Sequence, residues 1–299
     1  MTKKQKILVI VGPTSSGKST LAVELAKRFN GEIISGDSRQ VYRMLNIGTG
    51  KITKREMKGV PHHLLDIVSP RTTFTAYEFL IQGRKTIAEI VHRGKLPIVV
   101  GGSGFYIDAL VGRITFPDVP ADPEFRRTHT SGPIGPLVCM LEKLDPERAR
   151  TIDVHNRVRV IRALEIVRTL GKVPASAPRG RSQYDILWLG ITTPCEELNK
   201  NISTRLHARM RQGMVAEARR LHKDGLSYTR MEAFGLEYRF LARLLQGRLT
   251  RAQMIQDLET AIRQFSKRQR TYWKRNKEIR WHSPRPRSRV VKVVSRWVK

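Results

Sequence analysis

The sequence predicts an α/β fold in which a parallel β-sheet is flanked by helices and interrupted by an all-helical insertion. Short β-branched apolar runs alternate with amphipathic helical patterns as far as residue 115. No strand pattern appears in residues 116–184, which are rich in proline and arginine, and one returns at residues 186–191. We therefore expect a first part of the core at residues 1–115, a helical insertion domain at 116–184, a second part of the core at 185–283 and a basic tail at 284–299.

The charge of the chain points to a polyanionic partner. The 299 residues include 56 Lys and Arg against 26 Asp and Glu, which gives a net charge of +30, and nucleic acid is favoured over a membrane surface. The chain has no apolar run long enough for a membrane helix, and the first apolar run leads straight into a glycine motif, so we expect a cytoplasmic protein without a signal peptide. Cys139 and Cys195 lack metal or disulfide spacing, and we expect buried, inert thiols.

The strongest motif is a P-loop. A buried-strand pattern at residues 7–11 leads into G-x-x-x-x-G-K-S without a mismatch, and a helical pattern follows at residues 20–28, as in P-loop NTPase-like folds. Such a loop turns its backbone N–H groups toward an anion, while its lysine adds a charge and its serine a hydroxyl for Mg²⁺. It predicts a bound di- or triphosphate but not the reaction. The motif comprises Gly12, Pro13, Thr14, Ser15, Ser16, Gly17, Lys18 and Ser19.

Two further segments follow predicted strands at the edge of the sheet where ligands bind. Asp37 comes just after the strand pattern at residues 32–35, and Ser103 lies in a Gly-Gly-Ser-Gly turn after the strand pattern at residues 97–100. Asp37 either faces the same crevice as the P-loop or caps a helix, and the same choice is open for Ser103. A third, shorter strand is expected within residues 61–68, where His62 and His63 suit hydrogen bonding better than zinc, since no third ligand is near.

Several predicted helices are basic. Capping boxes open helices at Thr75 and Thr250, and one continuous helix is expected over residues 202–223. Arginines surround the apolar side of the helix at residues 156–169, and the basic tail is either a disordered arm or a short added element. A basic stripe, which fits phosphate contacts but also a solvated face, is formed on the last long helix by Arg263, Lys267, Arg270 and Lys274.

Taken together, these segments resemble the tRNA dimethylallyltransferases. The resemblance is carried by GPTSSGKS (residues 12–19), SGDSRQVY (35–42), NIGTGK (46–51), PHHLLD (61–66), VGGSGFY (100–106), RALE (162–165) and RQFSKRQ (263–269), and it spans nearly the whole chain. The chain departs from the family pattern at Ser103, where the family usually has Thr, and at residues 234–238, where the family has a Gly-Tyr-[Lys/Arg]-Glu segment.

The resemblance implies transfer of a dimethylallyl group from dimethylallyl pyrophosphate to N6 of the adenosine 3′ to the anticodon. The P-loop with Lys18, Mg²⁺ on Ser19 and Arg205 would act on the pyrophosphate, and Asp37 would accept the N6 proton with Ser103 beside it. We expect the enzyme to be a monomer that binds the anticodon stem-loop of tRNA. The implied RNA contacts are Asp37, Ser38, Arg39, Gln40, Ser103, Arg126, Val158, Arg159, Val160, Ile161, Arg162, Arg263, Lys267 and Arg270.

Two other classes of function remain open from the sequence. A P-loop kinase of a small molecule or nucleoside would share the loop and the carboxylate, but it would not explain the charge of +30. A basic ATP-driven RNA-binding module would explain the charge, but it would give Asp37 and Ser103 no reason to share a crevice with the P-loop.

Overall fold

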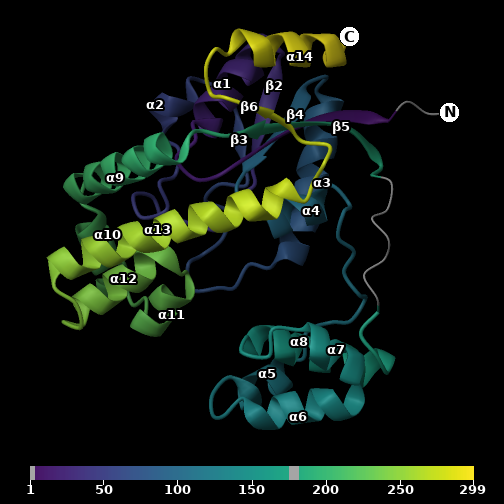
Figure 1. Cartoon of the computed structure of the whole chain (residues 1–299), viewed down its shortest axis with the longest axis vertical. Helices are drawn as coiled ribbons and strands as arrows, with labels where there is room; N and C mark the ends of the chain where they lie inside the picture. Colours follow the sequence, from purple (N-terminus) through teal and green to yellow (C-terminus); the bar gives the residue numbers. More distant parts are fainter. Residues whose placement is uncertain (1–3, 175–181) are drawn as a thin grey trace. The chain divides into compact units, whose positions relative to one another are not determined.

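The computed structural model describes residues 4–174 and 182–299 and shows an α/β fold with a parallel sheet (Figure 1). The chain divides into two compact units, one formed by Met1–Arg113 with Arg181–Lys299 and the other by Ile114–Gly180. The sheet has the order β3-β2-β4-β1-β5-β6, and every adjacent pair is parallel, which confirms the predicted fold class. Its strands are β1 Gln5–Val11, β2 Gly31–Ser35, β3 His62–His63, β4 Leu96–Gly101, β5 Tyr184–Ile191 and β6 Arg280–His282.

Alternate residues of β1 point to opposite faces of the sheet, and both faces are covered. Ile7, Val9 and Val11 belong to one apolar cluster, whereas Leu8 and Ile10 belong to a second. The second cluster is completed by α1 Lys18–Arg28 and α14 Ser288–Val298. Among the described residues, the first cluster is completed by seven helices: α3 Ala76–His92, α4 Gly104–Leu110, α9 Cys195–Arg211, α10 Met214–Lys223, α11 Tyr228–Ala233, α12 Leu236–Leu245 and α13 Arg251–Lys274. A short helix, α2 Lys54–Met57, precedes β3.

The register of the sheet brings the functional loops together. Val11 at the end of β1 pairs with Gly101 at the end of β4, and Ser35 at the end of β2 pairs with Val100. The loops that follow β1, β2 and β4 therefore leave the sheet at the same edge. Helix α13 packs against β5 through Trp273 and Trp188, whose ring centroids are 5.9 Å apart.

Local signals account for most helix boundaries. The capping boxes at Thr75 and Thr250 are both formed, as predicted. The single helix expected over residues 202–223 is wrong, because α9 ends at Arg211 and α10 begins at Met214 after Gly213, whose φ is 97°. The predicted third strand is reduced to His62–His63, with one further bridge between Tyr42 and Val68.

The described residues of the unit Ile114–Gly180 form helices joined by loops, with no strand. Its helices are α5 Pro123–His129, α6 Gly135–Leu144, α7 Pro146–Thr151 and α8 Arg157–Leu170. Val160 and Ile161 lie inside its apolar cluster, 0% and 5% exposed, so their side chains are not available for the predicted RNA contacts. Val158, two residues before Val160 on α8, is 76% exposed and remains available.

Two other expectations are settled by packing. The tail is an ordered element, since α14 buries Val290, Val291 and Val294 against the core. The prediction of buried thiols is wrong, because Cys139 and Cys195 are both exposed. Cys139 lies on α6 two residues from both Leu137 and Leu141, which form the buried face, and it therefore points to the opposite side of the helix.

Candidate active site

The P-loop connects the end of β1 to the start of α1 in the form that the motif predicts. Gly12 has φ of 145°, and a Cβ on it would lie 2.3 Å from the carbonyl oxygen of Ile191, so a larger residue would clash with β5. Gly17 has φ of 85° directly before the first residue of α1. Both glycines are therefore required for the tight turn that directs the loop's N–H groups and the N-terminus of α1 toward one point.

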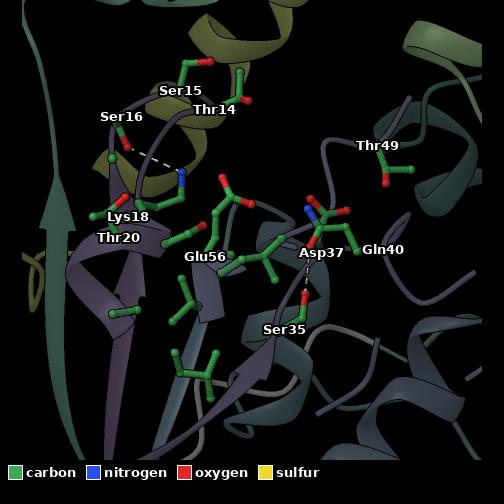
Figure 2. A pocket seen from close by; sticks show the side chains of 18 of the residues that line it. Thr14, Ser15, Ser16, Lys18, Thr20, Ser35, Asp37, Gln40, Thr49 and Glu56 are labelled. Carbon is green, nitrogen blue, oxygen red and sulfur yellow. Dashed lines mark hydrogen bonds between the residues drawn. The ribbon is translucent and has the colours of Figure 1, made fainter. Parts of the chain in front are cut away.

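A pocket of about 350 Å³ lies beside the P-loop, a volume suited to a small ligand (Figure 2). Figure 2 shows side chains from the P-loop, from the loop after β2 and from Thr49 and Glu56 around it. The pocket is lined by the P-loop residues from Thr14 to Ser19 together with Thr20, Ala22, Ile33, Ser35, Asp37, Gln40, Thr49, Ile52, Glu56, His62, Val100, Gly101, Gly102, Asn201, Arg205, Phe265 and Gln269.

Lys18 provides a cation whose charge is poorly compensated. Its Nζ donates to the carbonyl oxygen of Pro13 and, at 3.5 Å, to the hydroxyl of Ser16, both within the P-loop. Burial and then the nearby Arg205 lower the pKa of Lys18 to about 7, against a smaller opposing effect of Asp37. An anion bound in the pocket would remove this penalty, because it would stabilise the charged ammonium.

Asp37 faces the pocket and does not cap a helix. No helix begins in the turns that follow it, and its Oδ1 accepts a hydrogen bond from the backbone N–H of Arg39 at 2.8 Å. Burial raises the pKa of Asp37, while the backbone N–H groups of Arg39 and Gln40 act in the opposite direction. A carboxylate with a raised pKa is a better proton acceptor, and this one shares a pocket with Lys18.

Ser103 shapes the loop that carries Asp37. It occupies the N-cap position of α4 without capping that helix. Its Oγ instead accepts a hydrogen bond from the backbone N–H of Ser38 at 3.0 Å and lies 3.4 Å from the Ser38 hydroxyl. The pocket wall, as far as the described residues form it, includes Asp37 and Gln40 but not Ser38, Arg39 or Ser103.

Comparison with known proteins identifies the family. The model described as IPP transferase matches residues 40–276, and the model described as Isopentenyl transferase matches residues 5–74. The first of these matches spans most of the chain. This chain belongs to the IPP transferase family. It is 42% identical to the tRNA dimethylallyltransferase 1 of Geotalea uraniireducens, over 90% of this chain and 88% of that protein, and 39% identical to the tRNA dimethylallyltransferase of Carboxydothermus hydrogenoformans, over 93% and 91%.

Solved structures of tRNA-modifying transferases are similar to this chain as well. The tRNA isopentenylpyrophosphate transferase from Bacillus halodurans is similar with a TM-score of 0.71 at 36% identity, covering 94% of this chain and 90% of that one. A eukaryotic dimethylallyltransferase acting on tRNA is similar with a TM-score of 0.79 at 26% identity, covering 95% of this chain and 75% of that one.

Gln269 lines the pocket but is not identified by the sequence motifs. Gln269 on α13 accepts a hydrogen bond at its Oε1 from the P-loop N–H of Thr14 at 2.8 Å. Arg205 on α9 was expected at the site and does line the pocket, where its guanidinium donates to the carbonyl oxygen of Gly50 at 2.9 Å. Gln269 lies within the RQFSKRQ segment, so attention to all seven residues, and not only to the cations, could have found it.

The paired histidines make hydrogen bonds, as predicted. His63 lies 2.7 Å from a carboxylate oxygen of Glu32, and His62 Nδ1 lies 2.8 Å from the carbonyl oxygen of Val60. Within residues 4–174 and 182–299, no group of three or more His, Cys, Asp or Glu side chains is arranged to hold a metal ion. No helix in this part of the chain is long and apolar enough to cross a membrane.

The basic residues of this family member differ in how far their charge is already compensated. On α13, Arg263, Lys267 and Lys274 are all exposed, but Arg263 already pairs with Glu259. The partly buried Arg270 donates to the sulfur of Cys195 at 2.7 Å. In the helical unit, Arg126 and Arg162 both pair with the buried Glu165, at 2.6 and 3.1 Å. Arg159 has a side chain 63% exposed, 3.8 Å from Asp153.

Proposed function

We propose that this chain is a tRNA dimethylallyltransferase that transfers the dimethylallyl group of dimethylallyl pyrophosphate to N6 of the adenosine 3′ to the anticodon. The observation that carries this proposal is that one pocket is lined both by a phosphate-binding loop with Lys18 and by the carboxylate of Asp37. The first can hold a pyrophosphate, and the second can accept a proton from a nucleophile. The names of the similar proteins support the same reaction.

The P-loop serves the leaving group in this proposal. Negative charge gathers on the pyrophosphate as the allylic C–O bond breaks, and the loop's N–H groups, Lys18 and Arg205 stabilise that charge. The donor set also fits Mg²⁺, which is commonly held by one or two protein oxygens together with substrate phosphates and water, and Ser19 would provide the hydroxyl. The bound metal would neutralise part of the pyrophosphate charge.

Asp37 serves the acceptor. The lone pair of the adenine amine is delocalised into the ring, so the amine is a weak nucleophile and benefits from a base. As the bond from N6 to the allylic carbon forms and the C–O bond breaks, the N6 proton moves to Asp37 and the pyrophosphate departs. Gln40 lines the same pocket and would orient the base, which must leave its stack to enter. Ser103 and Ser38 would fix the loop around Asp37.

The RNA would be held mainly through its phosphates. The net charge of +30 supports a strong electrostatic attraction, and exposed cations on α13 and on α8 offer contacts. We also propose that the enzyme acts as a monomer, which light scattering on the purified protein would test.

One experiment separates this proposal from a kinase or an RNA-binding ATPase. The protein is incubated with unmodified tRNA and either dimethylallyl pyrophosphate or ATP, and the RNA is then digested to nucleosides and analysed by mass spectrometry. We expect one adenosine per tRNA to gain a dimethylallyl group, with dimethylallyl pyrophosphate only. Phosphate transfer from ATP, or ATP hydrolysis with no modified nucleoside, would contradict the proposal.

A further inference from the structure

The loop from Asn46 to Lys51 is organised by one buried carboxylate, that of Glu217 on α10. This side chain is 3% exposed. Its Oε2 accepts hydrogen bonds from the backbone N–H groups of Asn46 and Ile47 at 3.1 and 2.8 Å, and its Oε1 accepts one from Gly48 at 2.9 Å. Three consecutive loop amides thus converge on one buried anion, which fixes the path of the loop.

Residues of α9 and α12 complete the arrangement. Tyr238 donates its hydroxyl proton to Oε1 of Glu217 at 2.6 Å, and burial together with this carboxylate raises the pKa of Tyr238, so the hydroxyl stays protonated and remains a donor. Arg209 donates to the carbonyl oxygen of Gly48 and to Glu237, each at 2.9 Å. The segment at residues 234–238, which departs from the family pattern, therefore supplies two partners of this network.

The same loop reaches the pocket. Thr49 lines it, and the carbonyl oxygen of Gly50 accepts hydrogen bonds from Arg205 at 2.9 Å and from Gln40 at 3.4 Å. A Cβ on Gly50 would lie 2.5 Å from the guanidinium of Arg205, so the loop backbone and this side chain are in close contact. The position of the Gly50 carbonyl thus helps to determine where Arg205 lies in the pocket.

We infer that Glu217 is a positioning residue, which holds the Asn46–Lys51 loop so that the Gly50 carbonyl orients Arg205 toward the pyrophosphate. The inference rests on the proposed function for the identity of the ligand, but inorganic pyrophosphate tests it without the transfer reaction. Glu217 itself does not line the pocket formed by the described residues, so it acts through the loop.

The test is a double-mutant cycle on the affinity for inorganic pyrophosphate, measured by calorimetry with Mg²⁺ and without RNA. Glu217→Gln turns an N–H₂ group toward loop amides that need an acceptor, and losing such a bond to a charged group should raise the Kd about ten-fold. Tyr238→Phe removes one of the four donors and should raise it about three-fold. In an Arg205→Ala background neither change should weaken binding further, because the effect passes through Arg205.

Glu165→Gln is the matched control, since Glu165 is, like Glu217, a buried carboxylate that accepts a backbone N–H, although its side-chain partners are arginines and it lies in the helical unit. It should lower the melting temperature without changing the Kd for pyrophosphate. An unchanged Kd in both Glu217→Gln and Tyr238→Phe, or effects that multiply with that of Arg205→Ala, would overturn the inference. If Glu217→Gln does not fold, the Tyr238→Phe cycle decides alone. Failure of the wild-type protein to modify tRNA would instead contradict the proposed function.

Discussion

The side-chain oxygen of Gln269 on α13 accepts a hydrogen bond of 2.8 Å from the backbone N–H of Thr14 in the P-loop. A Cβ on Gly102 would lie 2.1 Å from the amide nitrogen of the same side chain, so Gln269 is enclosed between two of the loops that form the pocket. Helix α13 therefore supports the P-loop in addition to carrying the basic stripe.

Replacing Gln269 should separate support of the P-loop from charge in the pocket. Gln269→Ala leaves the Thr14 N–H without this acceptor and should lower the free energy of unfolding by about 1 kcal/mol or more. Gln269→Glu keeps an acceptor for the Thr14 N–H but adds a negative charge to the pocket. It should therefore weaken the affinity for pyrophosphate while lowering the free energy of unfolding less than Gln269→Ala does. Denaturant unfolding and pyrophosphate calorimetry on both variants check this, and equal loss of stability in the two would contradict it.

The lowered pKa of Lys18 predicts proton uptake on ligand binding. With a pKa of about 7 in the free protein, Lys18 is largely neutral at pH 8, and a bound pyrophosphate favours its charged form. Affinity should therefore rise as the pH falls from 9 toward 7, by at most about ten-fold per pH unit. Calorimetry at pH 8 in buffers of different ionisation enthalpy measures the proton taken up.

Lys18→Ala provides the control for this pH dependence. The variant should bind pyrophosphate more weakly at every pH and take up less than half as much proton at pH 8. Equal proton uptake by the wild type and the variant would assign the titration to another group, such as the ligand itself.

The structure ranks the cations of the basic stripe. Lys267 and Arg263 are both exposed, but Arg263 is already paired with Glu259. If the stripe contacts phosphates, Lys267→Ala should flatten the log–log dependence of tRNA affinity on salt by up to about one unit, and Arg263→Ala should flatten it less. Filter binding at several salt concentrations measures the slopes, with Lys27→Ala on α1 as an exposed control. Neutralising all four stripe residues without changing the slope would show that the stripe is a solvated face.

The parts of the site that could be predicted from the sequence are those encoded by neighbouring residues. The P-loop is contiguous, and Asp37 follows a buried strand whose carboxyl end must lie at the ligand edge of a parallel sheet. The role of Gln269 could not be predicted, because it depends on how α13 packs against a loop 255 residues earlier in the chain.

Other predictions were wrong or left open because the usual burial of a residue type does not determine whether one particular side chain is buried. Cysteine is usually buried, but Cys195 opens α9 at the surface beside Arg270. The basic neighbours of Val160 and Ile161 suggest RNA contacts along this segment, but the 3.6-residue period of α8 turns these two side chains inward. Apolar residues recur in the tail at the helical period, but whether they bury depends on long-range packing, and Val294 does pack against the core.

The central claim is that one pocket holds the leaving group with Lys18 and activates the nucleophile with Asp37. The most direct measurement is a single-turnover assay of Asp37→Asn at saturating dimethylallyl pyrophosphate and tRNA, together with its Kd for dimethylallyl pyrophosphate. We predict a Kd within about two-fold of the wild-type value and a rate lower by about 10²–10⁴-fold, because Asn keeps the shape of Asp37 but cannot accept the N6 proton. A wild-type rate in Asp37→Asn would contradict the assignment of the base and with it this account of the pocket.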